Sequence, residues 1–283
     1  MTGDTPSILI NDNVMPFRGA PYERIFLRSF AATSYIALGE WEDAAVEARN
    51  IIHLLQNRDG FPDDGYSRYL AGLCLEATGD YESAAFQYRQ VSNMVQGAVI
   101  EESGAILPAS SHAVASTVKS GKPELICLIG LGTLRNQPAA RGEHVDIYDG
   151  NRLLGRSYLF TDVQSLWEQT RAKLELRRTA KTVARIVLKE WLIHEMEKKD
   201  KDAGALLAIL LYGLEVEDLR RWETLPGRLH VARIQCPPGM RACRLVLRGS
   251  DGSTIKEQII NATSAGNSGM RLVFARLPDS GPI

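Results

Sequence analysis

Apolar residues recur at helical spacing through the first hundred residues of the chain. The apolar positions that precede the first turn are Phe26, Phe30, Ala31, Tyr35 and Leu38. This spacing predicts an amphipathic helix that ends near Gly39. Residues 34–51 and 74–91 superimpose without a gap at a constant offset of 40 residues. Because a fixed period is typical of stacked supersecondary units, we predict two pairs of antiparallel helices.

The two segments share glycine, acidic, aromatic and alanine residues in the same order. Gly39 and Gly79 stand where each first helix must end, a place that favours a residue able to adopt a positive φ. The pattern resembles the tetratricopeptide repeat, and Gly72 occupies the small-residue position of that repeat's first helix. Since about three repeats are needed for stability alone, we expect two repeats to dock on another part of the protein.

The resemblance to this repeat implies a groove that binds a protein partner. Charged and aromatic side chains on or before the first helices suit the polar anchoring of an extended segment. The candidate groove residues are Tyr22, Arg24, Arg28, Tyr35, Arg68 and Tyr69. The alternative is that the repeats only form a scaffold face for the rest of the chain.

The remainder of the chain predicts both strands and helices. The apolar run at residues 124–132 has the length of a buried strand, and residues 144–160 predict one or two strands around a turn at Gly150. Thr161 or Asp162 can cap a helix that runs to about residue 199, and a second apolar helix is expected at residues 205–222.

The last sixty residues contain four segments of strand length, with a hairpin turn at Asp251-Gly252. The fold class is therefore α+β, with tetratricopeptide-like helical repeats over residues 1–100. A mixed domain with long helices and a mostly antiparallel sheet follows over residues 101–283.

Charge and motif patterns argue against several classes of function. Lys and Arg total 33 and Asp and Glu total 34, a balance that argues against a dedicated nucleic-acid binder. No apolar run approaches the roughly 18 residues of a membrane span, and the first residues do not resemble a signal peptide. The phosphate-loop, dinucleotide, nucleophile-elbow and zinc-ligand spacings are all incomplete. We therefore expect no catalytic residues, no metal and no cofactor.

One basic segment supports an alternative function. Seven basic residues and one acidic residue lie between residues 171 and 189. Such a stretch can bind a phosphate, an anionic lipid or nucleic acid, and the candidate anion ligands are Arg177, Arg178 and Lys181. The other interpretation is a solvated helix face, because acidic residues follow at once. An anion-binding or catalytic α+β domain docked through the repeats is thus the second hypothesis.

Two of the four cysteines flank a turn sequence. If residues 238–241 form a four-residue loop, Cys236 and Cys243 face each other across a hairpin. A disulfide between them can then form in an oxidising compartment but is not expected in the cytosol. Cys74 and Cys127 lie in apolar stretches and are interpreted as small core residues.

Three blocks of sequence, at residues 22–49, 121–132 and 219–239, carry a wider resemblance. In this order they resemble a family of bacterial envelope lipoproteins of uncharacterised activity, with tetratricopeptide-like N-terminal repeats. Residues 222–226 are the most specific part. The resemblance implies attachment to the outer membrane from the periplasmic side. It also implies a role in envelope or cell-wall assembly, beside another lipoprotein or a cell-wall synthase.

The sequence departs from that family at its N-terminus, because the first cysteine is Cys74 and a lipidated N-terminal cysteine is absent. Contact with a membrane is expected only through such an anchor, and a cytoplasmic adaptor stays open as an alternative. The leading hypothesis is a non-catalytic protein-interaction adaptor of the bacterial cell envelope, with a protein as its partner.

Overall fold

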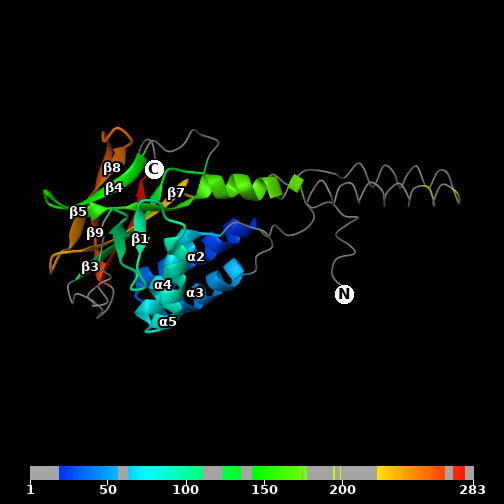
Figure 1. Ribbon diagram of the computed structural model, residues 1–283, viewed down its shortest axis with the longest axis horizontal. Helices are drawn as coiled ribbons and strands as arrows, with labels where there is room; N and C mark the ends of the chain where they lie inside the picture. The colour runs from blue at the N-terminus through cyan, green and yellow to red at the C-terminus, as the bar shows by residue number, and fades with distance from the viewer. Residues whose placement is uncertain are drawn as a thin grey trace. The chain divides into compact units, whose positions relative to one another are not determined.

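The computed structural model describes residues 19–56, 63–110, 123–134, 142–173, 175–176, 194, 198, 222–264 and 270–277. The chain divides into two compact units. One contains Pro21–Trp167 and Trp222–Ile283, and the other contains Met1–Ala20 and Glu168–Arg221. The first unit holds the helices and strands labelled in Figure 1. It spans the boundary predicted at residue 100, so that boundary does not separate two compact units.

Four helices form the N-terminal part of this unit, and they fit two helical repeats. They are α2 (Pro21–Leu38), α3 (Trp41–Gln56), α4 (Gly65–Ala77) and α5 (Tyr81–Ser92). Gly39 ends the turn after α2 with a φ of 83°, and Gly79 does the same after α4 with a φ of 88°. The prediction that these glycines terminate the first helices is confirmed, because a positive φ is costly for any residue with a Cβ.

The small residue predicted inside the second repeat permits a close helix contact. A Cβ added to Gly72 on α4 would lie 2.7 Å from Cε1 of Tyr88 on α5. Tyr88 is fully buried, so its ring fills the space that a larger residue at position 72 would need. The helices α4 and α5 therefore pack through a glycine and an aromatic ring.

Five strands form the first sheet, in the order β10-β11-β3-β7-β6. They are β10 (Thr263–Ser264), β11 (Met270–Leu277), β3 (Glu124–Leu131), β7 (Arg228–Gln235) and β6 (Tyr158–Asp162). β3 and β11 are parallel, and the other neighbouring pairs are antiparallel. The central strand β3 is apolar and almost wholly buried, as its compact sequence predicts.

Four antiparallel strands form the second sheet, in the order β5-β4-β8-β9. They are β5 (Arg152–Arg156), β4 (Gly142–Asp149), β8 (Ala242–Gly249) and β9 (Thr254–Asn261). Gly150 and Gly252 adopt positive φ values at the two hairpin turns, which confirms both predicted turns. Inward-facing residues of both sheets share one apolar core, so the sheets pack face to face.

The predicted hairpin between Cys236 and Cys243 is wrong. The strand before this turn, β7, pairs with β3 and β6, whereas the strand after it, β8, pairs with β4 and β9. The turn therefore carries the chain from one sheet to the other instead of joining neighbours within a sheet. The hairpin that made a disulfide between Cys236 and Cys243 possible is absent, and all four cysteines are free in this structure, so the two thiols are not linked.

Two further segments complete the described part of the fold. A short hairpin of β1 (Ala98–Ile100) and β2 (Ile106–Pro108) follows α5, where the sequence predicted only a connector. A helix begins at residue 163, and the Asp162 carboxylate accepts a hydrogen bond from the Ser165 amide at 2.9 Å, which confirms the predicted cap. No helix in the described part of the chain is long and apolar enough to span a membrane.

Candidate functional site

The second repeat docks on the first sheet through its first helix. Every residue of α4 from Gly65 to Glu76 is buried, and α4 contacts β6 and β7. In Figure 1 the four helices lie together on one side of the strands. The docking expected for a pair of repeats is thus made within the same compact unit. The face of α4 that was predicted to bind a partner is covered by other parts of the same compact unit, among them α5, the β1–β2 loop and β6.

Three of the six candidate groove residues are consequently inside the protein. Arg68 is 3% exposed and donates to the Asp63 carboxylate at 2.7 Å. Tyr69 is fully buried, and its hydroxyl donates to the Gly104 carbonyl at 2.7 Å. Tyr22 is buried as well. The assignment of these three residues to a partner-binding groove is therefore wrong, because their side chains make internal contacts and offer no free surface.

The other three candidates lie on one face of α2. Arg24 and Arg28 are exposed and Tyr35 is half-buried. Two exposed leucines that the sequence analysis missed share this face, Leu27 at 58% and Leu38 at 71% exposure. Their helical spacing alone could have placed them there. We call Arg24, Leu27, Arg28, Tyr35 and Leu38 the outer face of α2.

The two arginines of the outer face differ in their surroundings. Arg28 lies 3.2 Å from the Glu47 carboxylate of α3, which holds its guanidinium in place. Arg24 has no hydrogen bond or ion pair to any residue within the described ranges. The outer face contains no acidic residue, so its net charge is positive.

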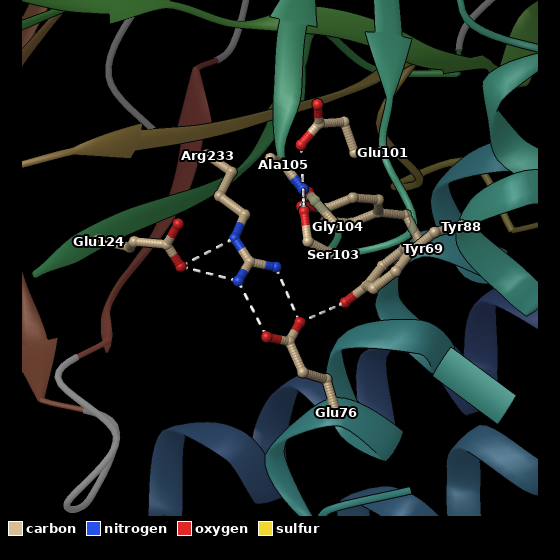
Figure 2. A network of polar contacts seen from close by, with 9 residues as sticks. All are labelled: Tyr69, Glu76, Tyr88, Glu101, Ser103, Gly104, Ala105, Glu124 and Arg233. Carbon is tan, nitrogen blue, oxygen red and sulfur yellow. Dashed lines mark hydrogen bonds and ion pairs between the residues drawn. The ribbon is translucent and has the colours of Figure 1, made fainter. Parts of the chain in front are cut away.

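A buried ionic cluster joins the repeats to the sheet, as Figure 2 shows. The Arg233 guanidinium on β7 donates to both carboxylate oxygens of Glu76 on α4, at 2.8 and 2.9 Å. It also donates to Glu124 at the start of β3, at 3.0 and 2.7 Å. The side chains of Arg233 and Glu76 are 4% and 5% exposed, whereas Glu124 is 32% exposed. The Arg233 guanidinium therefore binds two carboxylates, Glu76 on a helix and Glu124 on the sheet.

Two tyrosines and a tight loop close this cluster. The Tyr88 hydroxyl donates to Glu76 Oε2 at 2.8 Å, and burial raises the pKa of Tyr88 well above its usual value. Gly104, in the β1–β2 loop, has a φ of 79° and approaches Arg233 and Tyr88 too closely for any side chain. Because the charged groups bind one another under this loop, the cluster positions the repeats on the sheet.

A second polar contact fixes the start of α4. The buried Asp64 carboxylate accepts from the amides of Tyr66 and Ser67 at 3.2 and 3.3 Å, as a helix N-cap does. It also accepts from the hydroxyls of Ser67 and Thr161, the latter on β6. Burial raises the pKa of Asp64, and these hydrogen bonds oppose the rise. This cap therefore ties α4 to β6 independently of Arg233.

A buried histidine lies within the first sheet. His230 on β7 is fully buried, and its Nδ1 lies 3.3 Å from the Ser157 hydroxyl. Burial, followed by the nearby charges of Arg228 and His144, lowers the pKa of His230 to about 3. Its Nε2 has no hydrogen-bond partner among the described residues. His230 is therefore a neutral core residue at physiological pH, and no described cluster of His, Cys, Asp or Glu could hold a metal ion.

The segment at residues 222–226 returns the chain to α2. The Trp222 amide donates to the Glu23 carboxylate at 2.7 Å, and its ring packs edge-on against Phe30 at 5.8 Å between centroids. The Leu225 carbonyl accepts from the Leu134 amide at 2.7 Å. These contacts fix the inner side of α2 and leave its outer face open.

Arg177, Arg178 and Lys181, the candidate anion ligands, lie outside the described residues. The anion-binding hypothesis therefore stays a prediction. Comparison with known proteins found no matching family model, no matching curated protein and no matching solved structure.

Proposed function

We propose that this chain is a protein-binding adaptor whose partner docks on the outer face of α2. The observation that carries the proposal is the difference between the two repeats. The first helix of the second repeat, α4, is buried against the sheet and the neighbouring helices, whereas the first helix of the first repeat, α2, exposes arginine and leucine side chains to solvent. The same face contains Arg24, Arg28 and Tyr35, and arginine and tyrosine are residue types that frequently anchor protein interfaces.

The chemistry of the outer face defines the kind of partner that fits it. Arg24 is an exposed cation without an internal partner among the described residues, and Arg28 is held in a fixed place by Glu47. Leu27 and Leu38 add apolar surface on the same face. A complementary partner therefore presents carboxylates beside apolar side chains, since a guanidinium pairs most strongly with a carboxylate.

The proposal places this adaptor in the bacterial cell envelope, on the periplasmic side of the outer membrane. The resemblance of residues 22–49, 121–132 and 219–239 to envelope lipoproteins supports this location. Another lipoprotein or a cell-wall synthase is the proposed partner, and a role in envelope assembly follows from that pairing.

The experiment compares two double variants, each of which replaces one exposed arginine with glutamate and one exposed aliphatic residue with serine. Arg24→Glu with Leu27→Ser alters the outer face of α2. Arg49→Glu with Val46→Ser alters exposed residues of the neighbouring helix α3 and serves as the control. Each protein carries a C-terminal tag in its native cells, which are crosslinked mildly and fractionated before purification.

The envelope fraction should yield one partner with the wild type and with the α3 control. The α2 variant should recover at least about tenfold less of it, because a disrupted anchor commonly costs 2 kcal/mol or so of binding energy. Equal recovery with both double variants would contradict the assignment of the outer face. Recovery only in the cytosolic fraction would contradict the location.

A further inference from the structure

Three of the four cysteines lie in the core between the two sheets. Cys127 is on β3, Cys243 is on β8, and Cys236 follows the end of β7. All three belong to one cluster of buried apolar residues. Since β3 and β8 belong to different sheets, the cluster brings together thiols from the two facing layers.

The strand pattern directs Cys127 and Cys243 toward each other. Cys127 shares its side of β3 with Leu125 and Ile129, and Cys243 shares its side of β8 with Leu245. These residues line the same interior between the sheets. Cys243 is the main influence that raises the pKa of Cys127, and Cys127 is the main influence that lowers the pKa of Cys243, as expected of neighbouring thiols in this shared cluster. Cys236 lies in the same cluster, but it affects the pKa of Cys127 less than Cys243 does.

We propose that Cys127 and Cys243 form a disulfide between the two sheets when the chain folds under oxidising conditions. The bond would link the central strand of the first sheet to a central strand of the second. It differs from the linkage of Cys236 with Cys243 that the turn sequence suggests. The proposal rests on the packing of the sheets and does not depend on the proposed function.

The bond must form before the sheets close. Cys127 is fully buried and Cys243 is 2% exposed, so an oxidant cannot reach them in the folded protein. The interaction with Cys243, followed by burial, raises the pKa of Cys127, which keeps this folded thiol protonated and unreactive. During folding, the thiolate of one cysteine attacks a disulfide oxidant such as oxidised glutathione and releases one glutathione thiolate. The second cysteine thiolate then attacks the bound protein sulfur and releases the other glutathione.

The atoms and electrons of this thiol–disulfide exchange balance. Two thiol protons go to solvent or to the released glutathione, and two electrons reduce one glutathione disulfide to two thiols. The protein gains one sulfur–sulfur bond and loses two hydrogen atoms. No other reactant is needed.

The test refolds the full chain from denaturant in a buffer of oxidised and reduced glutathione. Free thiols are alkylated under denaturing conditions, the protein is digested, and linked peptides are identified by mass spectrometry. A parallel sample refolded with excess reductant identifies peptides that appear only when the thiols are oxidised. The Cys236→Ser variant is treated in the same way.

The expected result is a linked pair of peptides that contain Cys127 and Cys243, with Cys236 alkylated. The Cys236→Ser variant should give the same linked pair. Alkylation of all four cysteines after oxidative refolding would overturn the proposal. So would a dominant linkage of Cys236 with Cys243 or of Cys236 with Cys127. The wild-type result decides the matter even if the variant fails to refold.

Discussion

Replacing Arg233 with methionine tests whether the buried ionic cluster holds the repeats on the sheet. The change keeps most of the apolar length of the side chain and removes the guanidinium. Glu76 would lose two hydrogen bonds of 2.8 and 2.9 Å while remaining 5% exposed. Removing one partner of a buried ion pair typically costs about 3–5 kcal/mol, because the other charge stays buried without compensation. We expect a loss of that size in the free energy of unfolding.

An exposed ion pair in the same repeats provides the matched control. Arg28 pairs with Glu47 at 3.2 Å, but the Arg28 side chain is 46% exposed. Exposed pairs contribute roughly 0–1 kcal/mol, so Arg28→Met should cost no more than that. Urea unfolding followed by far-ultraviolet circular dichroism measures both variants against the wild type.

A double variant separates the charge effect from lost packing. Glu76→Met combined with Arg233→Met removes both buried charges, and such replacements are often neutral compared with breaking the pair. The double variant should therefore be more stable than Arg233→Met alone. The reasoning is refuted if Arg233→Met costs no more than Arg28→Met. It is also refuted if the costs of the two buried substitutions simply add.

Two further predictions concern the packing of the repeats and the pH dependence of stability. Gly72→Ala should destabilise the protein by about 1–3 kcal/mol in thermal unfolding, because its Cβ would lie 2.7 Å from the Tyr88 ring. An unchanged melting temperature would show that this contact can relax. The pKa of His230 is lowered to about 3, so only the unfolded chain binds its proton between pH 6.5 and pH 3. The free energy of unfolding should therefore decrease as the pH is lowered from 6.5 to 3, with a His230 contribution of up to about 1.4 kcal/mol per pH unit. His230→Leu should remove that contribution in urea unfolding measured at several pH values, and parallel curves would contradict the assignment.

Local sequence signals were sufficient to predict the helices and strands, but not which strands pair with one another. The helical spacing and the glycines at positions 39 and 79 predicted the repeats, and Asp251-Gly252 predicted the β8–β9 hairpin. The turn between Cys236 and Cys243 has a composition that also suits a hairpin. The strands on either side of this turn, β7 and β8, pair instead with the distant strands β3 and β4. No residue within the turn indicates that pairing.

The binding surface could be predicted only in part for the same reason. Position within a repeat identified Arg24, Arg28 and Tyr35 on the first helix, and these side chains are fully or partly accessible. The burial of Tyr69 depends in part on Phe160 of β6, a strand much later in the sequence, and the burial of Arg68 depends on its contacts with Asp63 and with Gln87 of α5. Arg233 and Glu76 are 157 residues apart in the sequence, so the sequence around either residue does not predict their contact.

Site-specific photocrosslinking tests the central claim that the partner docks on the outer face of α2. A photoreactive residue replaces Leu27 on that face in one protein and Val46 on α3 in another, both of them exposed positions. The account predicts a single crosslinked partner from position 27, joined through a segment that contains acidic and apolar residues, and no such product from position 46. Equal crosslinking from both positions, or a product from position 46 alone, would contradict the account.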